Sequence, residues 1–247
     1  MLKAYITNLG KYNEGELVGE YLAFPATTEE VQALLARIGV DGKRYEELFI
    51  TDYESDIAGL TENLGEYESI DELNYLAALL EELDDRGELS KFEAALELGD
   101  YCGSVQELIN LTENLGCYDI YPDIHDHDDL GRYYIEELDA MQVPEHLRNY
   151  IDYEAYGRDI ALEESGQFTD LGYVRDTGDR FDEVYDGERG SIPEEYRVMT
   201  FQDAEELTED EKSEWAMDIA YDMDEFFRQH DPQYAAEHPE EHAAREE

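Results

Sequence analysis

Negative charge is the strongest constraint that this sequence places on its fold. The 247 residues include 66 Asp and Glu side chains but only 17 Lys and Arg, which gives a formal charge of -49 at neutral pH. A field of this sign repels nucleic acids and anionic membranes and attracts basic surfaces. We therefore expect a basic protein partner, and neither a nucleic acid nor a membrane as a ligand.

The chain nevertheless has the composition of a folded protein. Hydrophobic residues make up 42% of it and aromatic residues 12%, which is enough to bury a core and more than a disordered acidic tail contains. The excess charge equals what roughly 80 Å of duplex DNA, about 25 base pairs, would display. This magnitude suits a protein that imitates a duplex.

The acidic residues are unevenly distributed along the chain. Residues 1–50 contain five basic and eight acidic side chains, whereas residues 51–247 contain 12 basic and 58 acidic ones. Adaptation to high salt, the alternative explanation of such a charge, predicts an acidic surface throughout. The distribution favours a functional acidic surface over salt adaptation.

The beginning of the chain is predicted to be a small α+β module. Runs of strand-forming residues alternate there with turn residues. A helix is expected between the second and third strands, because Thr27 and Glu30 form a capping box and Gly39 can stop the helix. The strands are expected at residues 4–8, 17–24 and 45–52.

A helical region is predicted from residue 69 to about residue 116. It opens with a second capping box, made by Ser69 and Glu72. Carboxylates on one helix face lie only roughly 5 to 6 Å apart, close to the spacing of phosphates along a DNA strand. The apolar face consists of Leu73, Leu76, Ala77, Leu80 and Leu83, and the acidic face consists of Asp71, Glu72, Glu81, Glu82, Asp84 and Asp85.

The second half of the chain contains further predicted elements. An amphipathic helix is expected at residues 130–141, and another begins after Pro144. Thr208 caps a last helix whose apolar stripe includes Trp215. Strand candidates lie at residues 168–174 and 183–185. The helix at residues 130–141 carries Leu130, Tyr134, Leu138 and Met141, and the next one carries Leu147, Tyr150 and Ile151.

One short motif occurs twice. Leu-Thr-Glu-Asn-Leu-Gly spans residues 60–65 and returns at residues 111–116, and both copies end in a glycine that can stop a helix. A duplicated helical unit and the chance reuse of a helix end explain this pattern equally well.

The sequence contains no strong catalytic or cofactor motif. Phosphate-binding loops and nucleophile elbows are absent, and Cys102 and Cys117 lack redox spacing and indicate reduced thiols. His125 and His127 would face one side of an extended segment, but such a run of His and Asp is more often a solvated loop than a metal site. We predict no catalytic, cofactor or metal site.

The sequence also lacks a long apolar leader or membrane span, which favours the cytoplasm.

Three blocks of sequence carry a family resemblance. Residues 5–25 read YITNLGKYNEGELVGEYLAFP, residues 132–137 read RYYIEE, and residues 149–160 read NYIDYEAYGRDI. In this order they resemble the ArdA family of antirestriction proteins, which bacterial plasmids, transposons and phages carry. The resemblance covers residues 3–168, and residues 169–247 extend beyond the usual end of the family.

The resemblance implies a fold and a function. The fold would be an elongated α+β chain of small α/β and helical domains that forms a homodimer, a curved acidic rod shaped like bent B-form DNA. Such a DNA mimic is an anti-defence protein of mobile genetic elements, acts in the cytoplasm of a bacterial host cell and is not an enzyme. It binds type I restriction-modification enzymes at their methyltransferase core and inhibits restriction and, to a varying extent, modification.

The resemblance and the element pattern together predict four parts of the chain. The last part is an additional α/β extension with one long helix and a frayed acidic tail. The parts are an N-terminal α+β domain at residues 1–60, a helical middle domain at residues 61–120, a C-terminal family domain at residues 121–170 and the extension at residues 171–247.

The predicted partner-binding site is a shared acidic surface. Many charges contribute to one field, so each of them should have a small individual effect. The candidate phosphate-mimicking carboxylates are Glu54, Asp56, Glu62, Glu66, Glu68, Asp71, Glu72, Glu81, Glu82, Asp84, Asp85, Asp128, Asp129, Glu136, Glu137, Asp139, Asp152 and Glu154.

Two other functions compete with DNA mimicry. An acidic chaperone, or an inhibitor of another basic DNA-binding protein or anti-phage nuclease, would use the same charge, but could do so with disordered acidic tails instead of a rigid dimer. A metal-dependent enzyme centred on His125 and His127 would bind zinc or manganese tightly and stoichiometrically.

Overall fold

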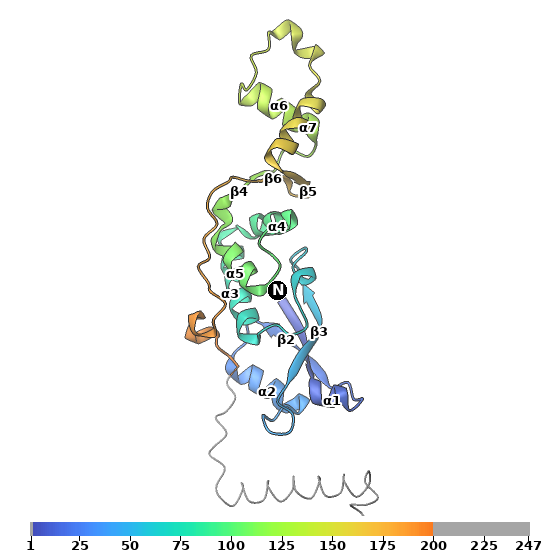
Figure 1. The fold of residues 1–247 in the computed structure, drawn as a ribbon, viewed down its shortest axis with the longest axis vertical. Helices are drawn as coiled ribbons and strands as arrows, with labels where there is room; N and C mark the ends of the chain where they lie inside the picture. The colour runs from blue at the N-terminus through green and yellow to red at the C-terminus, as the bar shows by residue number, and fades with distance from the viewer. Residues whose placement is uncertain (1, 200–247) are drawn as a thin grey trace, which may run out of the picture. The chain divides into compact units, whose positions relative to one another are not determined.

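The computed structural model describes residues 2–199 (Figure 1). These residues form two three-stranded antiparallel sheets, and the sequence between the two sheets is helical. Helices and antiparallel strands are both present, which confirms the predicted α+β class. The curved rod stays a prediction, and the helix expected around Trp215 lies outside the described residues.

The first sheet forms where the strand and turn pattern predicts it. Its strands are β1 (Leu2–Asn8), β2 (Gly19–Phe24) and β3 (Leu48–Ser55), in the order β2-β1-β3. In the central strand, Leu2, Ala4 and Ile6 are buried. This alternation is typical of a strand that presents one face to a core.

Two helices complete the N-terminal module. The short helix α1 (Leu9–Asn13) occupies the predicted turn after β1, and α2 (Thr28–Ile38) packs against β2. The predicted capping box is confirmed, because the Thr27 hydroxyl accepts from the Glu30 N–H at 3.3 Å and the Glu30 carboxylate accepts from the Thr27 N–H at 2.8 Å. Gly39 ends α2 in the left-handed conformation, at φ 75°.

The predicted helical region divides into three helices. They are α3 (Ile70–Arg86), α4 (Leu89–Leu98) and α5 (Val105–Glu113). Gly87 and Gly99 end the first two at φ 72° and 82°, a conformation that favours glycine. The predicted apolar stripe of α3 is buried from Leu73 to Leu83. The capping box at Ser69 is only half formed, because the Glu72 carboxylate accepts a hydrogen bond from Tyr185 instead.

The two copies of the repeated motif adopt different structures. The first copy contains the 3₁₀ turn η1 (Thr61–Asn63), whereas the second covers the end of α5 and the start of the 3₁₀ turn η2 (Leu115–Cys117). Neither Gly65 nor Gly116 has a positive φ, so the prediction that both glycines stop a helix is wrong. This difference favours chance reuse over duplication.

The second sheet joins segments that are distant in the sequence. Its strands are β4 (Tyr118–Tyr121), β5 (Gln167–Thr169) and β6 (Gly172–Asp176), in the order β4-β6-β5. The single strand predicted at residues 168–174 is a hairpin that turns next to Gly172, at φ 116°. The strand predicted at residues 183–185 is not formed. Because β6 begins after residue 170, this sheet crosses a predicted domain boundary; the division into domains stays a prediction.

Two helices pack against the second sheet, and both differ from the predicted ones. They are α6 (His127–Arg132), which passes into the π-helical turn η3 (Tyr133–Glu137), and α7 (Tyr153–Glu164). The helix predicted at residues 130–141 therefore ends early, and its Leu138 and Met141 are exposed. The helix predicted after Pro144 is the 3₁₀ segment η4 (Glu145–Tyr150). The α-helix begins only after Asp152, which caps it.

Residues 177–199, which we call the strap, return along the middle helices without forming a strand or an α-helix (Figure 1). The strap contains two 3₁₀ turns, η5 (Arg189–Ser191) and η6 (Glu194–Tyr196). Its Tyr185, Ile192 and Val198 are buried in the core that the first sheet and the middle helices form. The strap is therefore an integral part of this core.

Helices α6 and α7 cross closely because each carries a glycine at the contact. A Cβ atom at Gly131 would lie 2.0 Å from the Tyr153 carbonyl oxygen, and one at Gly157 would lie 1.9 Å from the His127 carbonyl oxygen. Both oxygens belong to backbone, which cannot move aside as the end of a flexible side chain can. The crossing therefore requires glycine at both positions.

We expect G157A to lower the free energy of unfolding by about 1 to 3 kcal/mol, because the added methyl group forces the two helices apart. G116A is the matched control, since a Cβ at Gly116 would meet nothing within 4 Å and should change the stability by less than about 0.5 kcal/mol. Chemical denaturation of the full chain measures both variants. Equal stabilities would contradict the requirement for glycine where the two helices cross.

Candidate functional site

The predicted carboxylates are mostly exposed. Thirteen of the eighteen are exposed, four are half-buried and one is buried. The half-buried ones are Glu68, Glu72, Asp128 and Asp129, and the buried one is Asp71. The exposed ones are Glu54, Asp56, Glu62, Glu66, Glu81, Glu82, Asp84, Asp85, Glu136, Glu137, Asp139, Asp152 and Glu154.

The end of α3 concentrates four exposed carboxylates, those of Glu81, Glu82, Asp84 and Asp85. Within residues 2–199 these side chains take part in no hydrogen bond or ion pair, and the nearby Arg86 pairs with Glu88 at 3.1 Å. Like charges three and four positions apart repel, and the C-terminal end of a helix is its negative pole. The arrangement costs stability, which is expected where function, not folding, selects the residues.

Tyrosine hydroxyls donate hydrogen bonds to several other carboxylates of the surface. Tyr45 donates to Glu14 at 2.8 Å, and Tyr21 donates to Asp52. The hydrogen bond to the Asp52 carboxylate raises the pKa of Tyr21 to about 12. A hydroxyl donor satisfies a carboxylate without cancelling its charge. The surface therefore keeps its negative field even where its acids are bound.

The carboxylates around α6 have local partners. Arg132 pairs with Asp128 at 2.6 Å, and the Asp129 carboxylate accepts from the His125 N–H at 3.2 Å. Tyr153 donates to Glu136 at 2.6 Å, and this hydrogen bond raises the pKa of Tyr153. Three other predicted carboxylates, those of Glu137, Asp139 and Glu154, form no hydrogen bond or ion pair within the described part of the chain.

A comparison of the sequence with known protein families shows which family the chain belongs to. The sequence model of the family described as antirestriction protein (ArdA) matches residues 4–175. The chain belongs to the ArdA antirestriction family. The ArdA match ends inside β6, beyond the residue 168 expected from the sequence, and the strap lies outside it. A comparison with curated proteins finds no match.

Two of the ArdA-like blocks contact each other in the structure. Residues 132–137 contribute Arg132, whose guanidinium lies 4.3 Å from the centre of the Tyr153 ring, and Tyr153 belongs to residues 149–160. Gly157 of the same block forms the crossing of α7 with α6. The two blocks therefore meet at one helix contact.

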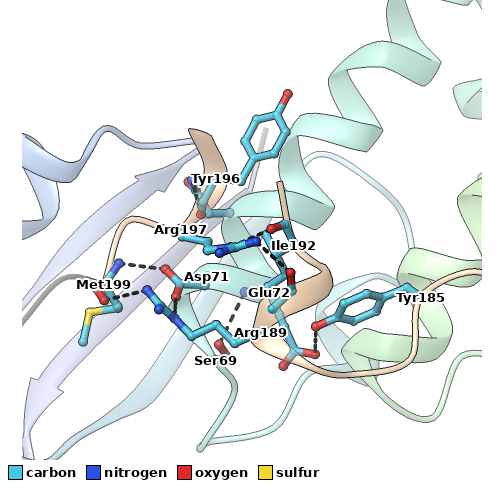
Figure 2. Close-up of polar contacts among 11 residues, drawn as sticks. Ser69, Asp71, Glu72, Tyr185, Arg189, Ile192, Tyr196, Arg197 and Met199 are labelled. Atoms are coloured by element: carbon cyan, nitrogen blue, oxygen red, sulfur yellow. Dashed lines mark hydrogen bonds and ion pairs between the residues drawn. The ribbon is translucent and has the colours of Figure 1, made fainter. Parts of the chain in front are cut away.

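The structure corrects the prediction for two carboxylates of α3. Asp71 is only 2% exposed and is bound by Arg189 and by the Met199 N–H of the strap, so it offers no free charge at the surface (Figure 2). Glu72 accepts from Tyr185 at 2.9 Å. Burial raises the pKa of Glu72 more than this hydrogen bond lowers it. Both carboxylates hold the strap, a role that the local sequence pattern does not reveal.

Glu164 is a carboxylate that the sequence reasoning missed. It accepts from Tyr173 at 3.1 Å and from Tyr134, and it pairs with Arg175. Arg175 also pairs with Asp119 of β4 at 3.0 Å. Burial, and then the Glu164 charge, raise the pKa of Tyr173. This network joins α7 to β6 and, through Arg175, to β4. Asp119 and Arg175 are 56 positions apart, so the sequence gives no local pattern for the whole network.

Among the described side chains, His125 and His127 do not lie in a group that could hold a metal ion. His127 packs its ring against Phe168, with the ring centres 4.9 Å apart, and His125 is exposed. Across residues 2–199, no group of three or more His, Cys, Asp or Glu side chains is arranged to hold a metal ion. None of the helices in that range is both long and apolar enough to cross a membrane.

We expect the quadruple variant E81Q/E82Q/D84N/D85N to raise the free energy of unfolding by about 1 to 2 kcal/mol at low salt, because it removes repulsion at the negative end of α3. The gain should shrink in 0.5 M salt, where exposed charges are screened. The matched control E16Q/E29Q/E46Q/E47Q neutralises four exposed acids of the first 50 residues, and it should change stability less. Thermal unfolding at both salt concentrations measures the difference; an equal gain in both variants would contradict a local repulsion at the end of α3.

Proposed function

We propose that this antirestriction protein mimics B-form DNA and occupies the DNA-binding surface of type I restriction-modification enzymes at their methyltransferase core. Its carboxylates take the place of phosphates as partners of Lys and Arg. Restriction is inhibited because DNA is excluded, and modification is inhibited as far as it uses the same surface. The observation that carries the proposal is the set of exposed carboxylates at the end of α3, which have no hydrogen-bond or ion-pair partner among residues 2–199 and lie inside the range that matches the ArdA family.

A mimic of this kind needs charge and spacing but no code for base edges. Phosphate contacts position a protein on DNA and carry no direct sequence information. The recognition sequence of the target enzyme should therefore matter little. Affinity should come from electrostatic steering and counterion release, and it should fall as salt rises.

The proposal includes the setting in which the protein acts. We infer a homodimer, which doubles the displayed charge, shaped as a curved rod in the cytoplasm of a bacterial host cell. A mobile genetic element would encode it as an anti-defence protein. It would act by binding alone, without catalysis.

The alternative proposal keeps the charge but changes the target. An acidic chaperone, or an inhibitor of another basic DNA-binding protein or anti-phage nuclease, would also bind a basic surface. The two proposals separate by target, because only the first predicts inhibition of type I enzymes.

The test is ATP-dependent cleavage of unmethylated DNA by a type I enzyme, titrated with the full chain. We expect near-stoichiometric inhibition that excess DNA relieves. Single Asn or Gln substitutions should weaken inhibition less than about threefold, E81Q/E82Q/D84N/D85N about tenfold, and a dozen neutralised carboxylates together should abolish it, since the charges share one field. The control E16Q/E29Q/E46Q/E47Q should stay within about twofold of the unaltered protein.

Two results would contradict the proposal in different ways. Loss of inhibition after one substitution would indicate a local hot spot instead of a shared field. No inhibition of several type I enzymes would exclude this target and favour the alternative.

A further inference from the structure

The backbone of the strap is bound by two asparagine side chains, those of Asn110 in α5 and of Asn114, the residue that follows α5. The Asn110 amide oxygen accepts from the Tyr185 N–H at 2.8 Å, and its amide nitrogen donates to the Tyr185 carbonyl at 2.9 Å. Asn114, one turn later, binds the N–H and the carbonyl of Asp182 in the same way, at 2.8 and 2.9 Å. Each asparagine thus pairs with one residue of an extended peptide as a neighbouring strand would.

Helix α3 binds the other end of the strap (Figure 2). The Asp71 carboxylate accepts from the Arg189 guanidinium and, at 2.7 Å, from the Met199 N–H. The Asn74 amide donates to the Tyr196 carbonyl at 3.2 Å. These partners of Asp71 and Asn74 belong to the strap and would be lost without it. Both side chains are nearly fully buried, at 2% and 1% exposed.

Side chains of the strap give the contact its sequence preference. Tyr185 is buried, reaches Glu72 with its hydroxyl and contacts the ring of Tyr75. The ring of Tyr196 stacks on that of Tyr75, with the ring centres 5.5 Å apart. Ile192 is buried in the core together with Tyr185. Together with Arg189, these side chains are the ones that the strap presents to α3 and to the core.

The residues that hold the strap lie inside the range that matches the ArdA family, and the strap lies outside it. The four clamping residues, Asp71, Asn74, Asn110 and Asn114, lie within residues 4–175, which match the ArdA family, whereas the whole strap follows residue 175. The clamping residues therefore lie in the part of the chain that matches the family, and the strap follows that part.

We propose that the face formed by α3 and α5 is a peptide-binding site, which this chain fills in cis with its own strap and which accepts the same peptide in trans. This inference goes beyond the antirestriction function and does not depend on it. It assigns the ligand class, a peptide that is paired through its backbone at two residues, carries a Tyr and an Arg four residues apart and forms two 3₁₀ turns.

The test uses the full chain with a protease site inserted between Gly178 and Asp179, where the strap is exposed and a Cβ at Gly178 would touch nothing. After cleavage, we expect the two fragments to stay together in size-exclusion chromatography. An excess of fluorescent peptide with the sequence of residues 181–199 should then replace the strap, and anisotropy should report its binding. The uncut protein, whose site is filled, is the control and should not bind the peptide.

Changes in the peptide test recognition without affecting the folding of the protein. R189Q in the peptide removes the guanidinium that binds buried Asp71. N-methylation at Tyr185 removes the N–H that donates a hydrogen bond to the Asn110 amide oxygen. Each should weaken binding at least about tenfold, and a scrambled peptide should not bind. Separation of the fragments on cleavage, or equal binding of the altered, scrambled and native peptides, would overturn the proposal.

Discussion

With 17 basic side chains against 66 acidic ones, the chain cannot neutralise its carboxylates, and it places several of its cations where segments meet. Arg175 joins α7 to the second sheet through Glu164 and Asp119, and Arg189 joins the strap to α3 through Asp71. Tyrosine hydroxyls and asparagine amides satisfy other polar groups without adding positive charge. The fold is therefore held together while its negative field stays largely uncancelled.

The sequence predicts those parts of the structure that short-range physics determines. The capping box at Thr27, the stop at Gly39 and the buried stripe of α3 all follow from residues a few positions apart. The close helix crossing at Gly157 and the pairing of Asn110 with Tyr185 escape prediction, because each depends on a distant segment that leaves no local pattern.

The candidate site shows the same division. Most of the predicted carboxylates are exposed, as an acidic helix face suggests, but Asp71 is buried. Asp71 follows buried Ile70 directly and lies on the same side of α3 as buried Asn74, so the acidic face assigned from the sequence begins one turn too early. Its partner Arg189 could not be found in this way, because the two residues are 118 positions apart. Charge counting thus identifies an acidic surface, whereas only the structure separates the acids that are displayed from those that bind the chain to itself.

If displayed carboxylates replace phosphates on a basic protein surface, this protein and DNA must compete for that surface. The most direct measurement is the anisotropy of fluorescent DNA bound to the methyltransferase core of a type I enzyme, titrated with the full chain at low and moderate salt. We predict complete displacement of the DNA near stoichiometry, with an affinity that falls as salt rises. A ternary complex, in which the protein binds the enzyme while the DNA stays bound, would contradict DNA mimicry.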